Sequence, residues 1–300
     1  MLNNLFGHRE TDRRVNPVFV PLISDQHGGH SGALMSPDTV IEIEDENGSQ
    51  YNYKPEMTER QKHLWNIYTD AIDKIAALAN GAPLHPLHIG DWVMGNKYLS
   101  ELVRPEISAQ IQIAFDGILP LLRMPNVKTF RSTRGTGAHE FALGSASGII
   151  TQLLRIAFHE IDISSVQHGL ATIGGVDIDY SHHGPTAGKR VWLRGNEARY
   201  YLRNCMMNDI LQYGKPASVY VRGHVHVPVV EVLQVAGQWS TLVIVPSMMI
   251  GGEFVNQATQ SEPRVSNGVM ALEIEDGKVR EIHDEWIHTQ DLRTREALSA

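Results

Sequence analysis

The sequence is poor in two features, and each shortage excludes a class of protein. It has one cysteine, Cys205, in 300 residues, which excludes an intrachain disulfide framework and a thiolate-rich zinc or iron–sulfur site. It has no apolar run approaching the roughly 18–20 residues that cross a bilayer, and its N-terminus has no apolar stretch of signal-peptide length. We therefore expect a cytoplasmic protein with no contact with a membrane.

Positive charge is also scarce. The chain has 26 Lys and Arg residues against 34 Asp and Glu residues, a net charge of -8 with histidine neutral. This balance disfavours a broad electrostatic grip on duplex nucleic acid. It leaves a nuclease open, because bound divalent cations can make an acidic pocket locally positive.

Histidine, in contrast, is abundant. There are 15 histidines, in a chain whose hydrophobic fraction of 42% and charged fraction of 20% are typical of a folded protein with a large core. With a single cysteine, any metal ion must be held by imidazole and carboxylate groups. Neutral imidazole together with carboxylate suits Mn, Fe, Zn or Ni.

Strand-like and helix-like patterns alternate along the chain, which predicts an α/β fold. We expect strands at 18–24, 84–89, 127–132, within 161–180 and at 217–222. We expect helices at 58–80 (with Thr58 as N-cap), 98–123 (with a break near Pro105), 141–158 and 196–213. We predict one domain over residues 1–300, with an insertion at about 31–57 and a C-terminal β-hairpin region at about 229–288 that includes a turn at Asp276-Gly277.

Histidine and aspartate gather just after the predicted strands. In an open α/β sheet, ligands bind at the edge where the strands end. Alternate residues of an extended segment point the same way, so each His-x-His or Asp-x-His pair can direct two donor atoms to one point. Taken singly, Asp-x-His and Gly-Asp are also ordinary turns, and two adjacent histidines are also a structural pair. The set is specific because of its order and placement: Asp25, His27, Asp91, His139, His182, His183, His224 and His226.

This set resembles the calcineurin-like metallophosphoesterase superfamily. The superfamily's motifs run Asp-x-His, Gly-Asp, Gly-Asn-His-Asp/Glu, His and Gly-His-x-His. Here they read SDQH (24–27), GD (90–91), GAHE (137–140), SHH (181–183) and GHVH (223–226). The resemblance covers roughly residues 18 to 250, and it implies two mixed β-sheets packed as a sandwich and flanked by helices, in four layers α/β/β/α.

The resemblance also implies roles for these residues. Two divalent metal ions would be bound, one by Asp25, His27 and His226 and the other by His182 and His224, with Asp91 bridging them. His139 would stand beside the phosphate as general acid or as stabiliser of the leaving oxygen. A metal-bridging hydroxide would attack phosphorus, and Arg131, Arg134 and Trp92 are further candidates for contact with the substrate.

The third motif departs from the superfamily pattern. Ala138 stands where the superfamily has an asparagine that binds the second metal, and alanine has no donor atom. Thr136, a shifted loop or the more remote Asn96 are the candidates to compensate. The run RGTGAH (134–139) is similar to a Gly-Thr-x-Ala-His version of this loop in phage-borne relatives.

The resemblance predicts a hydrolase of phosphate esters. Its phage-type third motif favours a phosphodiesterase or nuclease that acts on nucleotides or nucleic acid. Two alternatives stay open: a phosphomonoesterase for nucleotides or phosphoproteins, and a scaffold of the same fold without activity. The native metals and the oligomeric state also stay open, a homodimer being one option.

Overall fold

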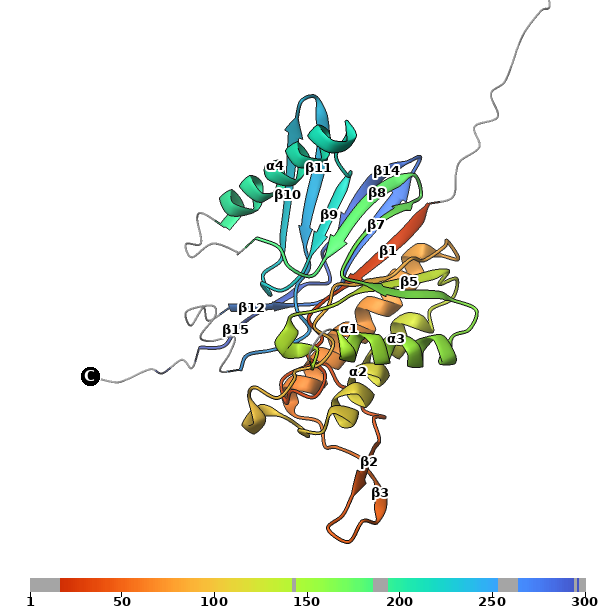
Figure 1. Ribbon diagram of the computed structural model, residues 1–300, viewed down its shortest axis with the longest axis vertical. Coiled ribbons are helices and arrows are strands. Elements are labelled where there is room, and N and C mark those ends of the chain that lie inside the picture. The colour runs from red at the N-terminus through yellow and green to blue at the C-terminus, as the bar shows by residue number, and fades with distance from the viewer. Residues whose placement is uncertain (1–16, 142–143, 186–193, 253–263, 294–295, 297–300) are drawn as a thin grey trace, which may run out of the picture.

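The computed structural model of the protein describes residues 17–141, 144–185, 194–252, 264–293 and 296 (Figure 1). The helices are α1 (Glu59–Ala79), α2 (Ile107–Leu122), α3 (Ser145–Ala157) and α4 (Arg194–Tyr213), with short 3-10 turns at Leu99–Glu101 and Gly137–His139. The strands are β1 (Val18–Ile23), β2 (Ile41–Glu44), β3 (Gln50–Tyr53), β4 (Leu87–His88), β5 (Thr129–Thr133), β6 (Asp162–Val166), β7 (His168–Ile173), β8 (Val176–Ser181), β9 (Val219–Arg222), β10 (Val229–Val235), β11 (Gln238–Ile244), β12 (Arg264–Asn267), β13 (Met270–Glu275), β14 (Lys278–His283) and β15 (His288–Asp291).

Two mixed sheets form the centre of the fold. The first has six strands in the order β14-β13-β1-β4-β5-β6, and β1, β4, β5 and β6 run parallel in it. The second has five strands in the order β10-β11-β9-β8-β7, and β8, β9 and β11 run parallel. Antiparallel strands form both edges of the five-stranded sheet and one edge of the six-stranded sheet, whose other edge is the parallel strand β6.

The alternation of apolar residues along the strands explains how these sheets pack. On β1, Val20 and Leu22 point into a core shared with Val219 and Val221 of the second sheet. Because neighbouring side chains of a strand lie on opposite faces, the other face of β1 carries Phe19 and Ile23, which join a second core under the helices. The strands are therefore apolar on both faces, as expected for sheets covered on both sides.

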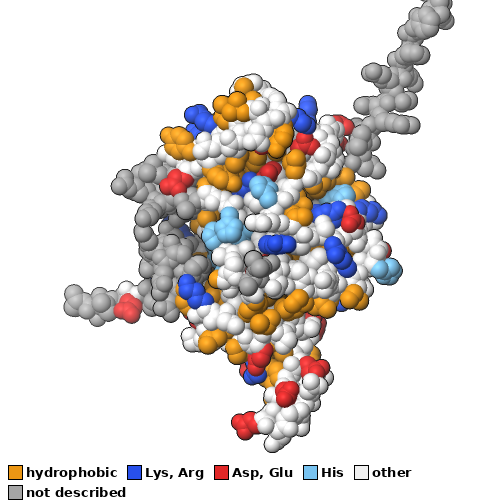
Figure 2. Space-filling model, viewed as in Figure 1, with side chains coloured by type: hydrophobic (Ala, Val, Ile, Leu, Met, Phe, Trp, Pro, Cys, Tyr) orange, Lys and Arg blue, Asp and Glu red, His pale blue; other side chains and the backbone are white. Residues whose placement is uncertain are grey.

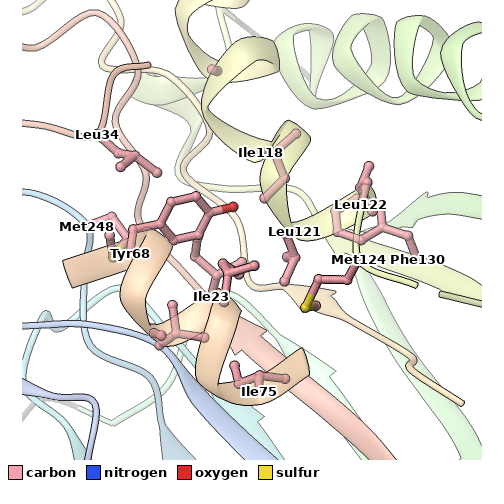
Figure 3. Close-up of a cluster of buried hydrophobic side chains, with 14 of the residues drawn as sticks. Ile23, Leu34, Tyr68, Ile75, Ile118, Leu121, Leu122, Met124, Phe130 and Met248 are labelled. Carbon is pink, nitrogen blue, oxygen red and sulfur yellow. The ribbon is translucent and has the colours of Figure 1, made fainter. Parts of the chain in front are cut away.

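The helices cover the two outer faces (Figure 1). Helices α1, α2 and α3 pack on the six-stranded sheet, and Figure 3 shows part of this cluster, in which Tyr68 of α1 and Ile118 of α2 lie with Ile23 of β1. Helix α4 packs through Leu202 and Met206 on the outer face of the five-stranded sheet. The predicted four-layer α/β/β/α arrangement is confirmed.

Local signals placed several elements correctly. Thr58 caps α1: its hydroxyl accepts the backbone N–H of Gln61, and the side-chain oxygen of Gln61 accepts the backbone N–H of Thr58. The predicted helical stretch at 98–123 is broken as expected: a 3-10 turn precedes Pro105, and α2 starts only at Ile107. The third helix starts later than predicted, at Ser145, because Gly144 adopts a left-handed conformation before it.

Two further regions extend from this core. Strands β2 and β3 form a hairpin that projects from the end of the molecule near α2 (Figure 1). Strands β13 and β14 form the predicted hairpin, in which Asp276 and Gly277 have the positive φ angles of a tight turn. Among the described helices, none has the length and apolar character needed to cross a membrane.

Candidate metal centre

The histidine and aspartate residues predicted as ligands meet at the carboxyl ends of the parallel strands. Asp25 and His27 follow β1, Asp91 follows β4, His182 follows β8, and the last pair, His224 and His226, follows β9. Hydrogen bonds join these loops across the two sheets. The backbone N–H of His224 donates to Asp25 Oδ2 over 3.0 Å, and the ring nitrogen Nδ1 of His182 lies 2.6 Å from the carbonyl oxygen of Ile89.

A first group of donor atoms consists of Asp25, His27 and His226. His226 Nε2 lies 3.2 Å from Asp25 Oδ1 and 3.2 Å from His27 Nε2, and His27 Nε2 lies 3.8 Å from Asp25 Oδ1. The other carboxylate oxygen, Asp25 Oδ2, accepts hydrogen bonds from the Ser24 hydroxyl and from the backbone of His224. The carboxylate is thus held on one side and offers its second oxygen to the two imidazoles.

A second group surrounds Asp91. Its Oδ2 lies 3.1 Å from His182 Nε2 and 3.9 Å from His139 Nε2. Asp91 also connects the groups, because Asp25, Asp91 and His182 have donor atoms that all lie within 4.8 Å of one another. His182, His183 and His224 form a further set at the same spacing.

The spacing and protonation of these atoms fit a metal ion. Ligands about 2.1 Å from one ion are roughly 3.0–3.4 Å apart in octahedral or tetrahedral geometry, which matches the shortest distances in both groups. The Nδ1–H of His182 donates to Ile89, so in the neutral ring Nε2 is an acceptor that faces the acceptor oxygen of Asp91. Two facing acceptors require a proton or a cation between them.

The charges of the site support the same conclusion. Burial lowers the pKa of His182, but the carboxylate of Asp91 outweighs burial and raises that pKa to about 9. A proton therefore favours the position between His182 Nε2 and Asp91, and a metal ion bound there would displace it. Burial raises the pKa of Asp25, yet the imidazole of His226 and its neighbours outweigh burial and hold that pKa well below its usual range. Burial and the nearby His139 keep the pKa of His27 well below its usual value, so this ring is neutral. Ionised carboxylate and neutral imidazole are the forms that bind a divalent metal.

The backbone at the site is strained. Asp25, His27, Asp91, His224 and His226 have φ angles of 51°, 47°, 51°, 73° and 57°. Positive φ is uncommon outside glycine, and such conformations persist where the surrounding structure enforces them, often at functional sites. Half of the ten positive-φ, non-glycine residues of the described chain are candidate metal ligands, so the strain is concentrated here.

Glycine is required at two positions beside the ligands. A Cβ at Gly90, whose φ is +81°, would lie 2.7 Å from His182 Nδ1, and a Cβ at Gly135 would overlap the carboxylate of Asp91. Both glycines therefore let a loop approach a ligand closely.

His139 lies in the 3-10 turn after β5. Its Nδ1 lies 2.6 Å from the carbonyl oxygen of Met94, which orients Nε2 towards Asp91, and the ring is packed edge-on to His27 with centroids 4.7 Å apart. The residue is buried. The structure thus brings His139 and the six predicted metal ligands together.

The three residues predicted to contact substrate have other surroundings in the structure, and their contact with a substrate stays a prediction. The guanidinium of Arg131 contacts Asp162 at the start of β6, the end of the sheet opposite the site. Trp92 is fully buried and stacks on His88, with ring centroids 3.6 Å apart. Arg134 is exposed, with its side chain against Gly144.

Sequence reasoning did not assign roles to two residues that organise the site. Ser24 places its hydroxyl between Asp25 and the carbonyl oxygen of Ile89, 3.1 Å away. Glu140 is buried, and its carboxylate accepts the backbone N–H groups of Gly135 and Ser147 over 2.7 and 2.9 Å. The available signal in the sequence was adjacency, because each residue directly neighbours a predicted site residue.

Figure 2 shows histidine side chains reaching the surface near the middle of one face. Among the candidate site residues, His183 is exposed.

Comparisons with known proteins add little to this geometry. No protein-family model matches the sequence, and no curated protein matches it at a significant level. A Thermotoga maritima protein solved by NMR is 15% identical, with a TM-score of 0.28, over 59% of this chain and 87% of its own. The sulfate thiohydrolase SoxB of Thermus thermophilus, in complex with glycerol, is 14% identical, with a TM-score of 0.37, over 92% of this chain and 56% of its own.

A protein of unknown function from Aquifex aeolicus is 13% identical, with a TM-score of 0.28, over 70% of this chain and 80% of its own. The chain therefore spans little more than half the length of SoxB. With TM-scores this low, the fold rests on the sheets described above, and the site rests on its own geometry.

Proposed function

We propose that this protein is a metal-dependent hydrolase of phosphate esters. The observation that carries the proposal is the pair of donor groups around Asp25 and Asp91, whose atoms have the spacing of metal ligands and are joined through the two carboxylates. In this proposal Asp25, His27 and His226 would hold one divalent ion, His182 and His224 would hold a second, and Asp91 would be a ligand shared by both. Mn, Fe, Zn and Ni all suit this mixture of imidazole and carboxylate.

The charge of the loaded site favours an anionic substrate. Two divalent ions bring four positive charges against the two negative charges of Asp25 and Asp91, so the loaded site is positive. A phosphate ester is a ligand of matching charge. When bound, the two metal ions would lower the pKa of a coordinated water and neutralise charge on the phosphate oxygens.

The protein's own residues hold the metal ligands in place and donate a proton. Ser24 and the backbone of His224 hold the Asp25 carboxylate, and Ile89 holds the His182 ring. His139 is the general acid. Because its Nδ1 already donates to Met94, Nε2 donates to the leaving oxygen only when the ring carries its second proton.

For the substrate, we propose a phosphodiester, in a nucleotide or a nucleic acid. This choice rests on the similarity of the third motif, RGTGAH (134–139), to the phage-type loop. The net charge of -8 favours small or single-stranded substrates over a duplex, because a duplex presents its dense negative charge to the whole protein surface.

The test is an assay of bis-p-nitrophenyl phosphate and p-nitrophenyl phosphate with Mn²⁺, with EDTA, and with Mn²⁺ restored after EDTA. We expect release that EDTA abolishes and Mn²⁺ restores, faster from the diester. His226→Ala should abolish the release. His168→Ala should not, because His168 lies on β7 and pairs with Asp179 of β8. Absence of metal-dependent release from both compounds would contradict the proposal, and faster monoester release would replace the diesterase with a phosphomonoesterase.

A further inference from the structure

The second metal position of the proposed hydrolase has one ligand fewer than the superfamily motifs predict, because Ala138 replaces the asparagine ligand and offers no donor atom. We infer that the hydroxyl of Thr136 is the missing ligand. The inference rests on the proposed function, since it names a further ligand of the same metal pair.

The position of the Thr136 hydroxyl is the first support. Its Oγ1 lies 3.3 Å from His182 Nε2, 3.3 Å from His224 Nδ1 and 3.4 Å from Asp91 Oδ2. These are the donor atoms of all three other residues assigned to this position. The distances match those of ligands around one ion, roughly 3.0–3.4 Å.

The second support is that the Thr136 hydroxyl does not cap the turn that follows it. Thr136 is the N-cap residue of the 3-10 turn Gly137–His139, and a threonine there normally accepts a backbone N–H of the turn. Its side chain makes no capping bond, although His139 N–H does donate to the backbone carbonyl of Thr136 over 2.8 Å. The hydroxyl is turned to the histidines instead.

The loop holds Thr136 in this orientation. The backbone N–H of Thr136 donates to Asp91 Oδ1 over 2.6 Å, so the backbone binds one oxygen of the carboxylate while the hydroxyl lies near the other. Glu140 accepts the N–H of the preceding residue, Gly135. The loop backbone therefore fixes the position of the hydroxyl.

The other candidates are placed less well. Asn96 is exposed, and Ala138 contributes only its carbonyl oxygen, which packs against Gly95. His183 belongs to a donor set with His182 and His224, but it is exposed, and its ring centroid lies 4.9 Å from that of His224. His183 is the comparison residue for the experiment.

A hydroxyl at this position has a chemical consequence. A neutral hydroxyl is a hard, weak ligand of the kind that Ser and Thr supply to Mg²⁺ in phosphate-binding loops. Together with a carboxylate, it shifts the preference of the second position towards Mn²⁺ and away from softer ions. We expect the second Mn²⁺ to bind more weakly than the first.

The experiment is calorimetric titration of EDTA-stripped protein with Mn²⁺. Thr136→Val removes the hydroxyl and keeps the branched shape, Thr136→Ser keeps the hydroxyl, and Thr136→Asn supplies an amide oxygen. Loss of a group that only supports a ligand already costs roughly 10–100-fold in affinity. We therefore expect Thr136→Val to weaken the second equivalent by about tenfold or more and to leave the first unchanged, with Thr136→Ser close to wild type and Thr136→Asn at least as tight.

Electron paramagnetic resonance gives a readout that a general loss of packing does not mimic. Wild type and Thr136→Ser should show the coupled signal of an Mn²⁺ pair at two equivalents, and Thr136→Val should show an isolated ion. Thr136→Ala is the second variant if Thr136→Val does not fold, and circular dichroism checks folding of each.

Two results would overturn the inference and leave the proposed function intact. One is Thr136→Val, or its Thr136→Ala substitute, binding two equivalents as wild type does. The other is His183→Ala losing the second equivalent while the variant without the hydroxyl keeps it, which would make His183 the ligand. Failure of wild type to bind any Mn²⁺ would instead overturn the proposed function itself.

Discussion

At the scale of the residue, the tautomers of two histidines define how the site works. His182 and His139 each have Nδ1 within 2.6 Å of a backbone carbonyl, that of Ile89 and that of Met94. A carbonyl accepts but never donates, so both rings carry a proton on Nδ1 and turn Nε2 towards Asp91. In the proposed function, this same hydrogen bond would prepare one ring as a metal ligand and the other as a proton donor.

The proposed role of His139 leads to a prediction. We expect His139→Ala to lower turnover of bis-p-nitrophenyl phosphate on the order of 10²- to 10⁴-fold, the usual contribution of a general acid. Metal content, measured by mass spectrometry of the dialysed protein, should stay at the wild-type level. His159→Ala, at a histidine that is 91% exposed, is the matched control. Turnover equal to that of the control would contradict the role.

The contacts of the candidate substrate-binding residues are set by neighbouring strands. Arg131 has a partner on the neighbouring strand, Asp162, that the sequence pattern did not indicate. Trp92 follows Asp91 directly, but its ring stacks on His88 in the core instead of lining the site. Both outcomes depend on contacts between strands, which the order of residues in one strand does not contain.

At the scale of the element, the segment from β5 to α3 is organised by one buried carboxylate. Glu140 accepts the N–H of Gly135 in the loop and the N–H of Ser147 in the first turn of α3. An anionic group at a helix N-terminus is favourable. Glu140 thus fixes the loop that carries Thr136 and His139 to a helix that is itself packed in the core through Ile150 and Leu154.

We predict that Glu140→Gln destabilises the protein. The amide can accept only one of the two N–H groups, and its own NH₂ then faces the other, so a buried donor loses its partner. The free energy of unfolding should fall by about 1–3 kcal/mol, as measured by urea denaturation. The same change at Glu160, which is 62% exposed, is the control, and equal effects at both positions would show that the Glu140 contacts carry no stability.

At the scale of the whole molecule, the site depends on the contact between the two sheets. Its candidate ligands come from both sheets: Asp25 and Asp91 from the six-stranded sheet, and His182, His224 and His226 from the five-stranded sheet. The apolar core between the sheets, in which Leu22 is fully buried, therefore sets the distance between the two halves of the site.

We predict that Leu22→Ala lowers the free energy of unfolding by about 2–5 kcal/mol, the range for a large buried residue that leaves a cavity. Leu170→Ala is the matched control. Leu170 is 68% exposed on β7, and its loss should cost about 0.5 kcal/mol or less. Denaturant titration of both variants checks this, and similar midpoints would mean that the sheets do not share the core described here.

The sequence by itself determined most of the central strands and helices and the strand ends at which the candidate ligands lie. The apolar run of β1, the Thr58 cap of α1 and the Asp276-Gly277 turn are local signals, because each depends on residues a few positions apart. The order of the Asp and His motifs then placed the ligands at strand ends, since the carboxyl ends of parallel strands share one edge.

Only the tertiary structure decided which side chains complete the site. His27 and His226 are 199 positions apart in the chain, yet their Nε2 atoms lie 3.2 Å apart. The sequence offered Thr136 and, more remotely, Asn96 as candidates, and of these two the Thr136 hydroxyl lies within 3.4 Å of donor atoms of His182, His224 and Asp91. Such distances are set by how two sheets pack and how a loop is held, and packing brings together residues whose separation along the chain carries no information about their contact.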